Sequence, residues 1–287
     1  MARLTGGLVN TAYRVTSMNG RSVCVRLHAS GFAAWSREQH AIARAAGAAL
    51  PVPRVLHTDA NDWRIGCPYT VYEWIPGMTL NECRRAYPDA LTLLAAPLGR
   101  LAAAVASVSS LDEASSAGPP AEPSEIALGR RIVAAATALK QGASRLEPAL
   151  AADLAGLLDH SADLFAGQEG EMGMLHGDFG GRNILVSQDS EASWRIAGLI
   201  DWEAAGRGCR LWDVGSLFRY GNRYSVDFRD RFEEGYNAMG ELPCDWYRMC
   251  RLLDSLRLLD IVNGERELPD VFAECRGLIR SVIDDWS

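Results

Sequence analysis

Three polar residues, Asp178, Asn183 and Asp201, carry the clearest chemical signal in the sequence. The stretch LHGDFGGRNILV (175–186) places Asp178 and Asn183 five residues apart in a polar loop between apolar flanks. Asp201 directly follows an apolar run at 196–200. If that run pairs as a strand with 184–186, Asp201 returns beside Asn183. The spacing therefore predicts that both carboxylates and the amide face one cleft.

These three side chains are suited to phosphoryl transfer. Carboxylate and amide oxygens bind Mg²⁺, which also keeps waters and phosphate oxygens as ligands. We therefore expect Asn183 and Asp201 to hold the metal, and Asp178 to receive or orient the proton of an acceptor hydroxyl. The bland alternative is that Asp178 and Asn183 only stabilise a turn. The apolar run that ends in Asp201, 18 residues after Asn183, makes the chemical interpretation the better one.

The elements that must position this loop differ between the two ends of the chain. Residues 1–76 contain short β-prone runs, a hairpin signal at Asn19-Gly20 and one helical stretch at 34–49. From residue 77 the chain is mainly helical, apart from an exposed acidic loop at 112–125 and the strands that flank the polar loop. Helices are predicted near 88–110, 126–142, 148–166, 227–239, 245–262 and 269–286. We predict an α+β fold with a small β-rich N-terminal lobe (1–76), a larger, mainly helical C-terminal lobe (77–287) and a ligand cleft between them.

Charge and composition exclude several classes of protein. The chain has 287 residues, of which 48% are hydrophobic and 23% charged, so it can bury a sizeable core and wholesale disorder is excluded. The net charge is −7, and residues 225–287 supply most of it, with 14 Asp and Glu against 8 Arg. This balance argues against a nucleic-acid partner and suits a cationic small molecule.

Targeting signals and cysteine chemistry are also predicted to be absent. No apolar run approaches the roughly 18 residues of a membrane span, and the N-terminus lacks the apolar stretch of a signal peptide. The seven cysteines are scattered and form no CxxC pair. We therefore expect a cytoplasmic protein with free thiols, no disulfide framework and no zinc site.

Beyond these patterns, LHGDFGGRNILV and GLIDWEAAGRG resemble the aminoglycoside phosphotransferase and choline kinase family, which shares the protein-kinase-like fold. Further segments that resemble family motifs follow in the family's order, namely GGLVNTAYRV, VCVRL, REQHAI, LPVPRVL and YEWIPGMTL. The resemblance covers nearly the whole chain, weakly at 88–165 and beyond 225. It implies a Mg²⁺-dependent small-molecule kinase that uses ATP, with GTP also open.

The resemblance implies that seven residues contact the nucleotide: Gly6, Gly7, Asn10, Arg26, Glu38, Glu73 and Ile75. Arg26 would contact the α- and β-phosphates and Glu38 would hold it in place. Glu73 and Ile75 would offer backbone groups to the adenine. Arg26 stands where many relatives have Lys, and a guanidinium binds phosphate in a different geometry from an ammonium.

The resemblance also implies how the polar loop is fixed. His176 would brace it rather than transfer protons, and Asp213 would hold it without a catalytic role. After Gly208 the chain has Cys209-Arg210 where relatives often have Asp-Pro, which places the local turn in question.

The acceptor is predicted from charge. We expect a polycationic antibiotic, an aminoglycoside or a basic peptide, whose phosphorylation would confer resistance. Six acidic residues of the C-terminal helices are candidate contacts: Asp227, Glu233, Glu234, Asp245, Asp270 and Asp284. The alternatives are a metabolic kinase of an amino alcohol or sugar, a macrolide kinase, and a nucleotide-binding relative without transfer activity. The oligomeric state is not predicted.

Overall fold

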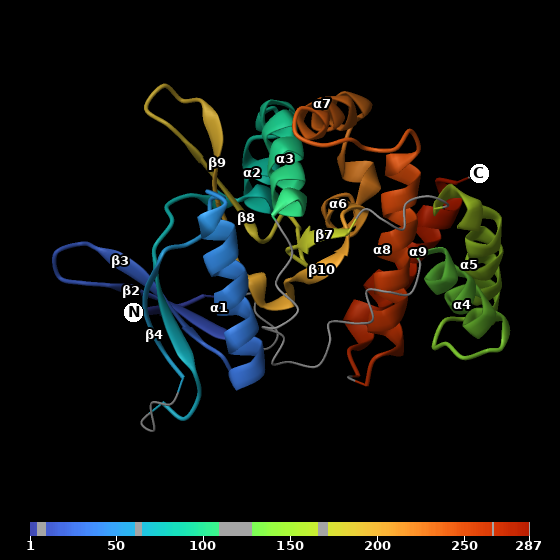
Figure 1. Ribbon diagram of the computed structural model, residues 1–287, viewed down its shortest axis with the longest axis horizontal. Helices are drawn as coiled ribbons and strands as arrows, with labels where there is room; N and C mark the ends of the chain where they lie inside the picture. The colour runs from blue at the N-terminus through green and yellow to red at the C-terminus, as the bar shows by residue number, and fades with distance from the viewer. Residues whose placement is uncertain (5–9, 61–64, 109–127, 166–171, 266, 287) are drawn as a thin grey trace.

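The computed structural model describes residues 1–4, 10–60, 65–108, 128–165, 172–265 and 267–286 (Figure 1). Its N-terminal part is an antiparallel sheet in the order β1-β2-β3-β5-β4. The strands are β1 (Ala2–Arg3), β2 (Thr11–Thr16), β3 (Ser22–Leu27), β4 (Val55–Asp59) and β5 (Tyr69–Glu73). Helix α1 (Phe32–Gly47) lies over this sheet and directs Glu38, Ala41, Ile42 and Ala45 into the interface.

The hairpin predicted at Asn19-Gly20 joins β2 to β3. Gly20 has a φ of 82°, a backbone conformation that glycine adopts without steric cost. The backbone N–H of Ser17 donates to the carbonyl of Arg21 across the turn, at 2.8 Å. This register pairs Ala12 with Arg26 and places Arg26 on a central strand of the sheet.

The connection to the C-terminal lobe contains a short helix that the sequence analysis did not predict. After β6 (Met78–Thr79), helix α2 (Leu80–Ala86) begins with a capping box. The Thr79 hydroxyl accepts from the Glu82 backbone N–H at 3.2 Å, and the Glu82 carboxylate accepts from the Thr79 backbone N–H at 2.7 Å. These hydrogen bonds lower the pKa of Glu82. The capping box thus begins a helix beside the polar loop.

The C-terminal lobe is mainly helical, as predicted. Its described α-helices after α2 are α3 (Ala90–Ser107), α4 (Leu128–Lys140), α5 (Pro148–Ser161), α6 (Leu211–Leu217), α7 (Val226–Asn237), α8 (Trp246–Asn263) and α9 (Pro269–Asp284). Short 3₁₀ turns are η2 (Ala162–Phe165), η3 (Trp202–Ala204) and η4 (Gly221–Arg223). Helix α8 stops at Asn263-Gly264, as the sequence indicated. The predicted loop at 112–125 lies outside the described residues.

The polar loop connects two small antiparallel sheets of this lobe. The strands are β7 (Met172–Leu175), β8 (Ile184–Gln188), β9 (Trp194–Leu199) and β10 (Gly206–Cys209). β8 pairs with β9 and with β6, and β7 pairs with β10. The strand pairing of 184–186 with the run before Asp201 is therefore confirmed. β10 was not predicted, because its sequence GRGC has no strand pattern.

Helix α3 is a longer apolar segment than we expected from the sequence. It has 18 residues and a mean hydropathy of 1.5, so by length and composition it could cross a membrane. The expectation that no apolar run approaches this length is wrong. Half of the helix is buried, and it packs against α7, β7 and β9 inside the C-terminal lobe. Its apolarity is that of a helix in a protein core.

The described residues form the predicted α+β, bilobal, protein-kinase-like fold, with the sheet and α1 at one end and the helices at the other (Figure 1). The seven cysteines, all in described parts of the chain, are thiols, as expected. In the C-terminal lobe, Phe218 packs edge-on against Phe232 and Trp246, with ring centroids 5.0 and 5.3 Å apart. This aromatic cluster holds α6, α7 and α8 together behind the polar loop.

Candidate active site

The polar loop 176–183 between β7 and β8 is held in place by Asp213 of α6. The Asp213 carboxylate accepts the backbone N–H groups of His176 at 2.6 Å and Gly177 at 2.9 Å. Gly177 has a φ of 82°, and a Cβ there would lie 2.0 Å from the Ala204 carbonyl oxygen. Asp213 therefore fixes the loop, and the residue at 177 must be glycine.

His176 is completely buried beneath the loop. Its Nδ1 accepts the backbone N–H of Asp178 at 3.2 Å, so Nε2 carries the proton and donates to the Ile200 carbonyl at 2.9 Å. Burial lowers the pKa of His176, although Asp213 opposes this shift. The imidazole is thus neutral and uses both nitrogens in structural hydrogen bonds, which makes it a brace, as expected.

Asp178 and Asn183 form one hydrogen-bonded unit. The Asn183 amide Nδ2 donates to the Asp178 backbone carbonyl at 2.9 Å and to its carboxylate Oδ2 at 2.8 Å. The Asp178 side chain is 29% exposed, whereas Asn183 is buried. The amide oxygen of Asn183 accepts no hydrogen bond from a described residue. Asp178 can therefore receive a hydrogen bond from an acceptor hydroxyl, while Asn183 keeps an oxygen for a cation.

Asp201 lies beside Asn183, as the predicted strand pairing requires. The Ile200 backbone N–H donates to the Asn183 carbonyl at 2.9 Å, and Ile184 pairs with Leu199. Asp201 leaves the strand in a left-handed conformation (φ 69°, ψ 62°) and is 31% exposed. Two oxygen donors on adjacent strand ends suit Mg²⁺, which takes its other ligands from water and phosphate. Within the described residues, no group of three or more His, Cys, Asp or Glu side chains forms an all-protein metal site.

Arg26 reaches from the N-terminal sheet to these residues. Its Nη2 donates to Asp201 at 2.6 Å and to Glu203 at 2.7 Å, and its Nε lies 3.6 Å from the Glu38 carboxylate. Glu38 is buried and also approaches His28 Nδ1 at 3.3 Å. Burial opposes the charge of Arg26, but Glu38 and then Asp201 and Glu203 outweigh it and raise its pKa. The ion pair of Arg26 with Glu38 thus forms as expected.

Comparison with known proteins decides which family has this arrangement. A family model described as the phosphotransferase enzyme family, APH, matches residues 1–250. The chain belongs to this phosphotransferase family. It is therefore a small-molecule phosphotransferase with an alcohol group as its acceptor. The comparison with curated proteins finds no match.

Solved structures show the same fold at low identity. A thermostable mutant of aminoglycoside phosphotransferase APH(4)-Ia in its apo form has a TM-score of 0.68 and 20% identity, over 99% of this chain and 94% of its own. A choline/ethanolamine kinase family protein from Mesorhizobium loti has a TM-score of 0.61 and 19% identity, over 98% and 87%. The amicoumacin kinase hAmiN, in complex with AMP-PNP, Ca²⁺ and Ami, has a TM-score of 0.60 and 14% identity, over 98% and 87%. Likenesses at such identities establish the fold alone.

Glu203 is a site residue of this phosphotransferase that the sequence analysis missed. The 3₁₀ turn η3 after Asp201 places its carboxylate on Arg26, and Asn10 donates its side-chain amide to the same carboxylate. Burial and the neighbouring Asp201 raise the pKa of Glu203. The sequence IDWE shows an acid two residues after Asp201. The 3₁₀ turn that directs this acid to Arg26 could not be predicted from the sequence.

Two other residues predicted to contact the nucleotide, Glu73 and Ile75, lie at and just after the end of β5. Glu73 ends β5, where its backbone N–H donates to the Arg54 carbonyl at 2.9 Å and its exposed carboxylate pairs with Arg54 at 3.0 Å. Ile75 packs its side chain against Gly198 in β9. Both lie at the junction of the lobes, so contact with adenine stays a prediction. Gly6 and Gly7 lie outside the described residues.

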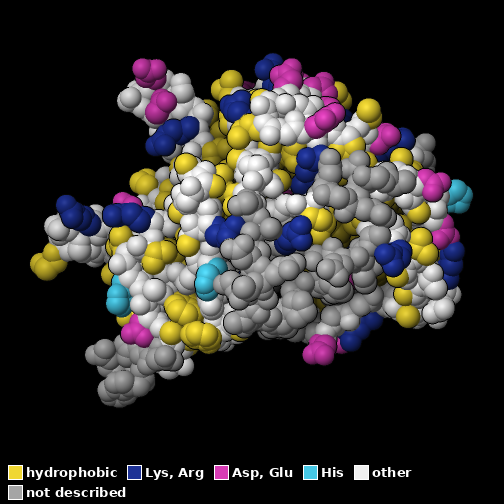
Figure 2. Space-filling model, viewed as in Figure 1, with side chains coloured by type: hydrophobic (Ala, Val, Ile, Leu, Met, Phe, Trp, Pro, Cys, Tyr) yellow, Lys and Arg dark blue, Asp and Glu magenta, His cyan; other side chains and the backbone are white. Residues whose placement is uncertain are grey.

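The six acids predicted to bind the acceptor do not form one cluster. Three of them, Asp227, Glu233 and Glu234, lie on α7, which packs on α3, and acidic side chains gather over this helix in Figure 2. Asp245 precedes α8, and the other two, Asp270 and Asp284, lie at opposite ends of α9. Five are exposed and Glu233 is half-buried, and no described contact joins any of them to Asp178. Their role in acceptor binding stays a prediction.

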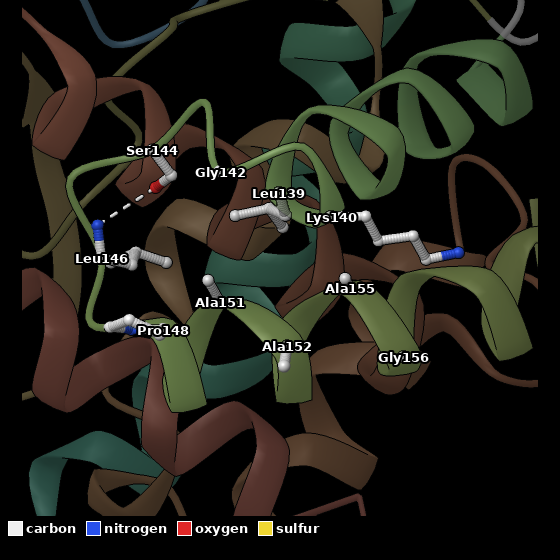
Figure 3. Close-up of a pocket in the computed structure, with 10 residues that line it drawn as sticks. All are labelled: Leu139, Lys140, Gly142, Ser144, Leu146, Pro148, Ala151, Ala152, Ala155 and Gly156. Carbon is white, nitrogen blue, oxygen red and sulfur yellow. Dashed lines mark hydrogen bonds between the residues drawn. The ribbon is translucent and has the colours of Figure 1, made fainter.

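A cavity of about 540 Å³ lies away from the polar loop, between α4 and α5 (Figure 3). Its lining is mostly apolar, and Lys140 at its rim pairs with Asp159 rather than pointing into it. The residues of this cavity and those of the Arg26–Asp201 network do not overlap. The cavity therefore contains none of the residues predicted to act in catalysis or to bind the metal.

Proposed function

We propose that this phosphotransferase moves the γ-phosphate of Mg·ATP to the hydroxyl of a small molecule, with Asp178 as the base. The observation that carries the proposal is the convergence of an exposed carboxylate at Asp178 with adjacent oxygens at Asn183 and Asp201. This is the division of labour that phosphoryl transfer requires, with metal ligands on one side of the acceptor base.

Each residue has a separate task in this mechanism. Asn183 and Asp201 would hold Mg²⁺, which supplies neutralisation of phosphate charge when bound. The Asp178 carboxylate, oriented by the Asn183 amide, accepts a hydrogen bond from the acceptor hydroxyl and takes its proton as the oxygen attacks phosphorus. Arg26, held by Glu38, donates to phosphate oxygens once the nucleotide replaces part of its present contacts. Positioning and charge neutralisation supply most of the rate in such reactions.

A cationic antibiotic as acceptor, with resistance as its consequence, stays a prediction of the sequence. Its support is the net charge of −7 and the chemistry of neighbours, since APH(4)-Ia variants have been crystallised with hygromycin B. The choline/ethanolamine kinase family neighbour supports the alternative of a metabolic kinase. A nucleotide-binding protein without transfer activity is disfavoured, because the chain has Asp178, Asn183 and Asp201 together. A cytoplasmic location likewise stays a prediction.

The test is the variant Asp178→Ala. Loss of the base should lower kcat by about 10²- to 10⁴-fold. ATP affinity should stay within about twofold, because Asp178 contacts the hydroxyl and not the nucleotide. Asp153→Ala, at an exposed acid of α5, is the matched control and should leave both quantities unchanged. Turnover of Asp178→Ala near that of the control would refute the assignment of Asp178.

A further inference from the structure

The side of the polar loop that faces away from the N-terminal sheet is built around arginine. Arg219 follows α6, the helix that fixes the loop through Asp213, and its Nε and Nη2 both donate to the carboxylate of Asp254, at 2.9 and 2.7 Å. The Asp254 side chain is 3% exposed and that of Arg219 is 14% exposed. Burial opposes the charge of Arg219, but Asp254 and then Asp178 outweigh it and raise its pKa. Arg219 is thus fixed within electrostatic range of the catalytic carboxylate.

Helix α2 brings a second arginine to the same side. The Asn81 backbone N–H donates to the Gly181 carbonyl at 2.9 Å, so the first turn of α2 touches the polar loop. Arg84 lies one turn further along the same face. Its Nε is buried and has no hydrogen-bond partner, and no described carboxylate forms an ion pair with it. A buried N–H group without an acceptor is costly unless a ligand supplies one.

Arg223, in η4, lies next to Arg84. Burial and then repulsion from Arg223 lower the pKa of Arg84. The Arg223 guanidinium stacks on the ring of Tyr220 at 3.6 Å from its centroid. The Tyr220 hydroxyl donates to the Glu274 carboxylate at 2.5 Å, so this carboxylate binds Tyr220 and not Arg223. No described carboxylate pairs with Arg223 either.

We call this side of the polar loop the acceptor side. Four arginines define it, namely Arg84, Arg182, Arg219 and Arg223, and the acids near them are Asp178, Asp254 and Glu274. Asp254 neutralises Arg219, and Arg182 lies 3.9 Å from Asp178. Two neighbouring guanidiniums, those of Arg84 and Arg223, stay without a described carboxylate. Adjacent like charges without counter-charges are the composition of an anion site and not of an ammonium site.

We propose that the acceptor carries an anionic group, a carboxylate or a phosphate ester, which Arg84 and Arg223 bind while its hydroxyl lies at Asp178. The inference rests on the proposed function, because it assigns the acceptor of the same reaction. It predicts the opposite sign of charge from the cationic antibiotic that the sequence suggested. The net acidity of the chain does not conflict with it, because exposed acids such as Asp227, Glu234 and Asp284 have no described contact with Asp178.

The experiment compares matched acceptors and matched variants. Phosphate transfer and binding are measured with D-gluconate, D-gluconamide and D-glucosamine, and with glycerol 1-phosphate and glycerol, within a wider screen of hydroxylated acids, neutral compounds and amines. The acids should be preferred over their neutral and amine analogues. Preference for D-gluconate would identify the anionic group as a carboxylate, whereas preference for glycerol 1-phosphate would identify it as a phosphate ester. For the best acid, Arg84→Gln and Arg223→Gln should each raise KM by about 10- to 100-fold, the effect of losing a charge-assisted hydrogen bond.

The matched control is Arg85→Gln, which removes the same charge from an exposed neighbour on α2. It should leave both KM and kcat within about twofold of the wild type. Preference for amines over acids, or a KM that responds equally to Arg84→Gln and Arg85→Gln, would overturn the inference while the kinase function stands.

Failure of the proposed function would look different, because no compound would be phosphorylated. The inference then depends on direct binding of the anionic compounds, measured by calorimetry with the wild type and the three variants. Binding that weakens in Arg84→Gln and Arg223→Gln but not in Arg85→Gln would support the anion site. No binding of any acid, or binding indifferent to Arg84 and Arg223, would refute it.

Discussion

The two sides of the polar loop differ in the sign of their excess charge. On the nucleotide side one guanidinium, Arg26, lies among the carboxylates of Glu38, Asp201 and Glu203. On the acceptor side Arg84 and Arg223 lie together without a described carboxylate partner. An excess of acid attracts a metal cation, whereas an excess of arginine attracts an anion. The comparison teaches that net charge of the chain says little about a site, since opposite excesses coexist on the two sides of one loop.

Both sides nevertheless use the same device to fix an arginine. Glu38 of α1 and Asp254 of α8 are buried carboxylates, and each holds one guanidinium that reaches toward the loop. Burial of the acid makes the pair rigid, because an acid without its partner would carry an uncompensated charge. The loop itself belongs to both sides, since the proposed roles direct Asp178 to the acceptor and Asn183 to the metal.

The largest effect is expected where both sides fail together, at Gly177→Ala. The new Cβ would lie 2.0 Å from the Ala204 carbonyl, in the turn that follows Asp201 and contains Glu203, so the loop and the turn must separate. A displacement of this size should lower kcat by about 100-fold or more. KM values for nucleotide and acceptor should both rise.

Gly142→Ala is the matched control for this change. Gly142 also has a positive φ, of 72°, but a Cβ there meets nothing within 4 Å. It should cost only the conformational penalty, about 1–2 kcal/mol of unfolding free energy, and leave kcat unchanged. Steady-state kinetics and thermal unfolding of the two variants separate the effects. Equal losses of activity in both variants would mean that the contact at Ala204 has no catalytic consequence.

The next effect tests whether the two sides are independent. Glu38→Gln should raise KM for ATP by about 10-fold and leave KM for the acceptor unchanged, because Arg26 alone loses one of its three carboxylate partners. Asp254→Asn should do the reverse through Arg219. Each should lower the unfolding free energy by about 3 kcal/mol, because each leaves a buried arginine underpaired.

The measurement is a pair of full kinetic titrations, in ATP and in acceptor, for both variants. If Asp254→Asn changed KM for ATP as strongly as Glu38→Gln does, the sides would form one coupled network. The assignment of Arg219 to the acceptor side would then be wrong.

Local patterns in the sequence predicted one half of this comparison and not the other. Asp178 and Asn183 share one loop, and an alternating hairpin register returns Asp201 to Asn183, so short-range spacing was sufficient. Arg219 and Asp254 are 35 residues apart and meet only because α6 packs on α8. No periodicity within either helix specifies which residues of the two face each other.

Short elements also escaped the sequence analysis. Helix α2, which carries Arg84, has seven residues, and β10 has four residues without an apolar alternation. Elements of this length are decided by capping and by pairing partners rather than by composition. The Thr79-x-x-Glu82 box was the signal that could have revealed α2. Two of the acceptor-side arginines, Arg84 in α2 and Arg223 in η4, come from such elements, which is why the sequence did not reveal them.

The smallest effect is expected at the acids that the sequence assigned to the acceptor. Asp227 pairs with Arg231 at 3.1 Å, four residues along the exposed face of α7. Asp227→Asn should change the unfolding free energy by less than about 0.5 kcal/mol and leave KM for every acceptor within twofold. Kinetics with D-glucosamine and D-gluconate in this variant check the expectation. A tenfold rise in KM confined to the amine would place α7 against a cationic acceptor, and the assignment of an anionic acceptor to Arg84 and Arg223 would then be wrong.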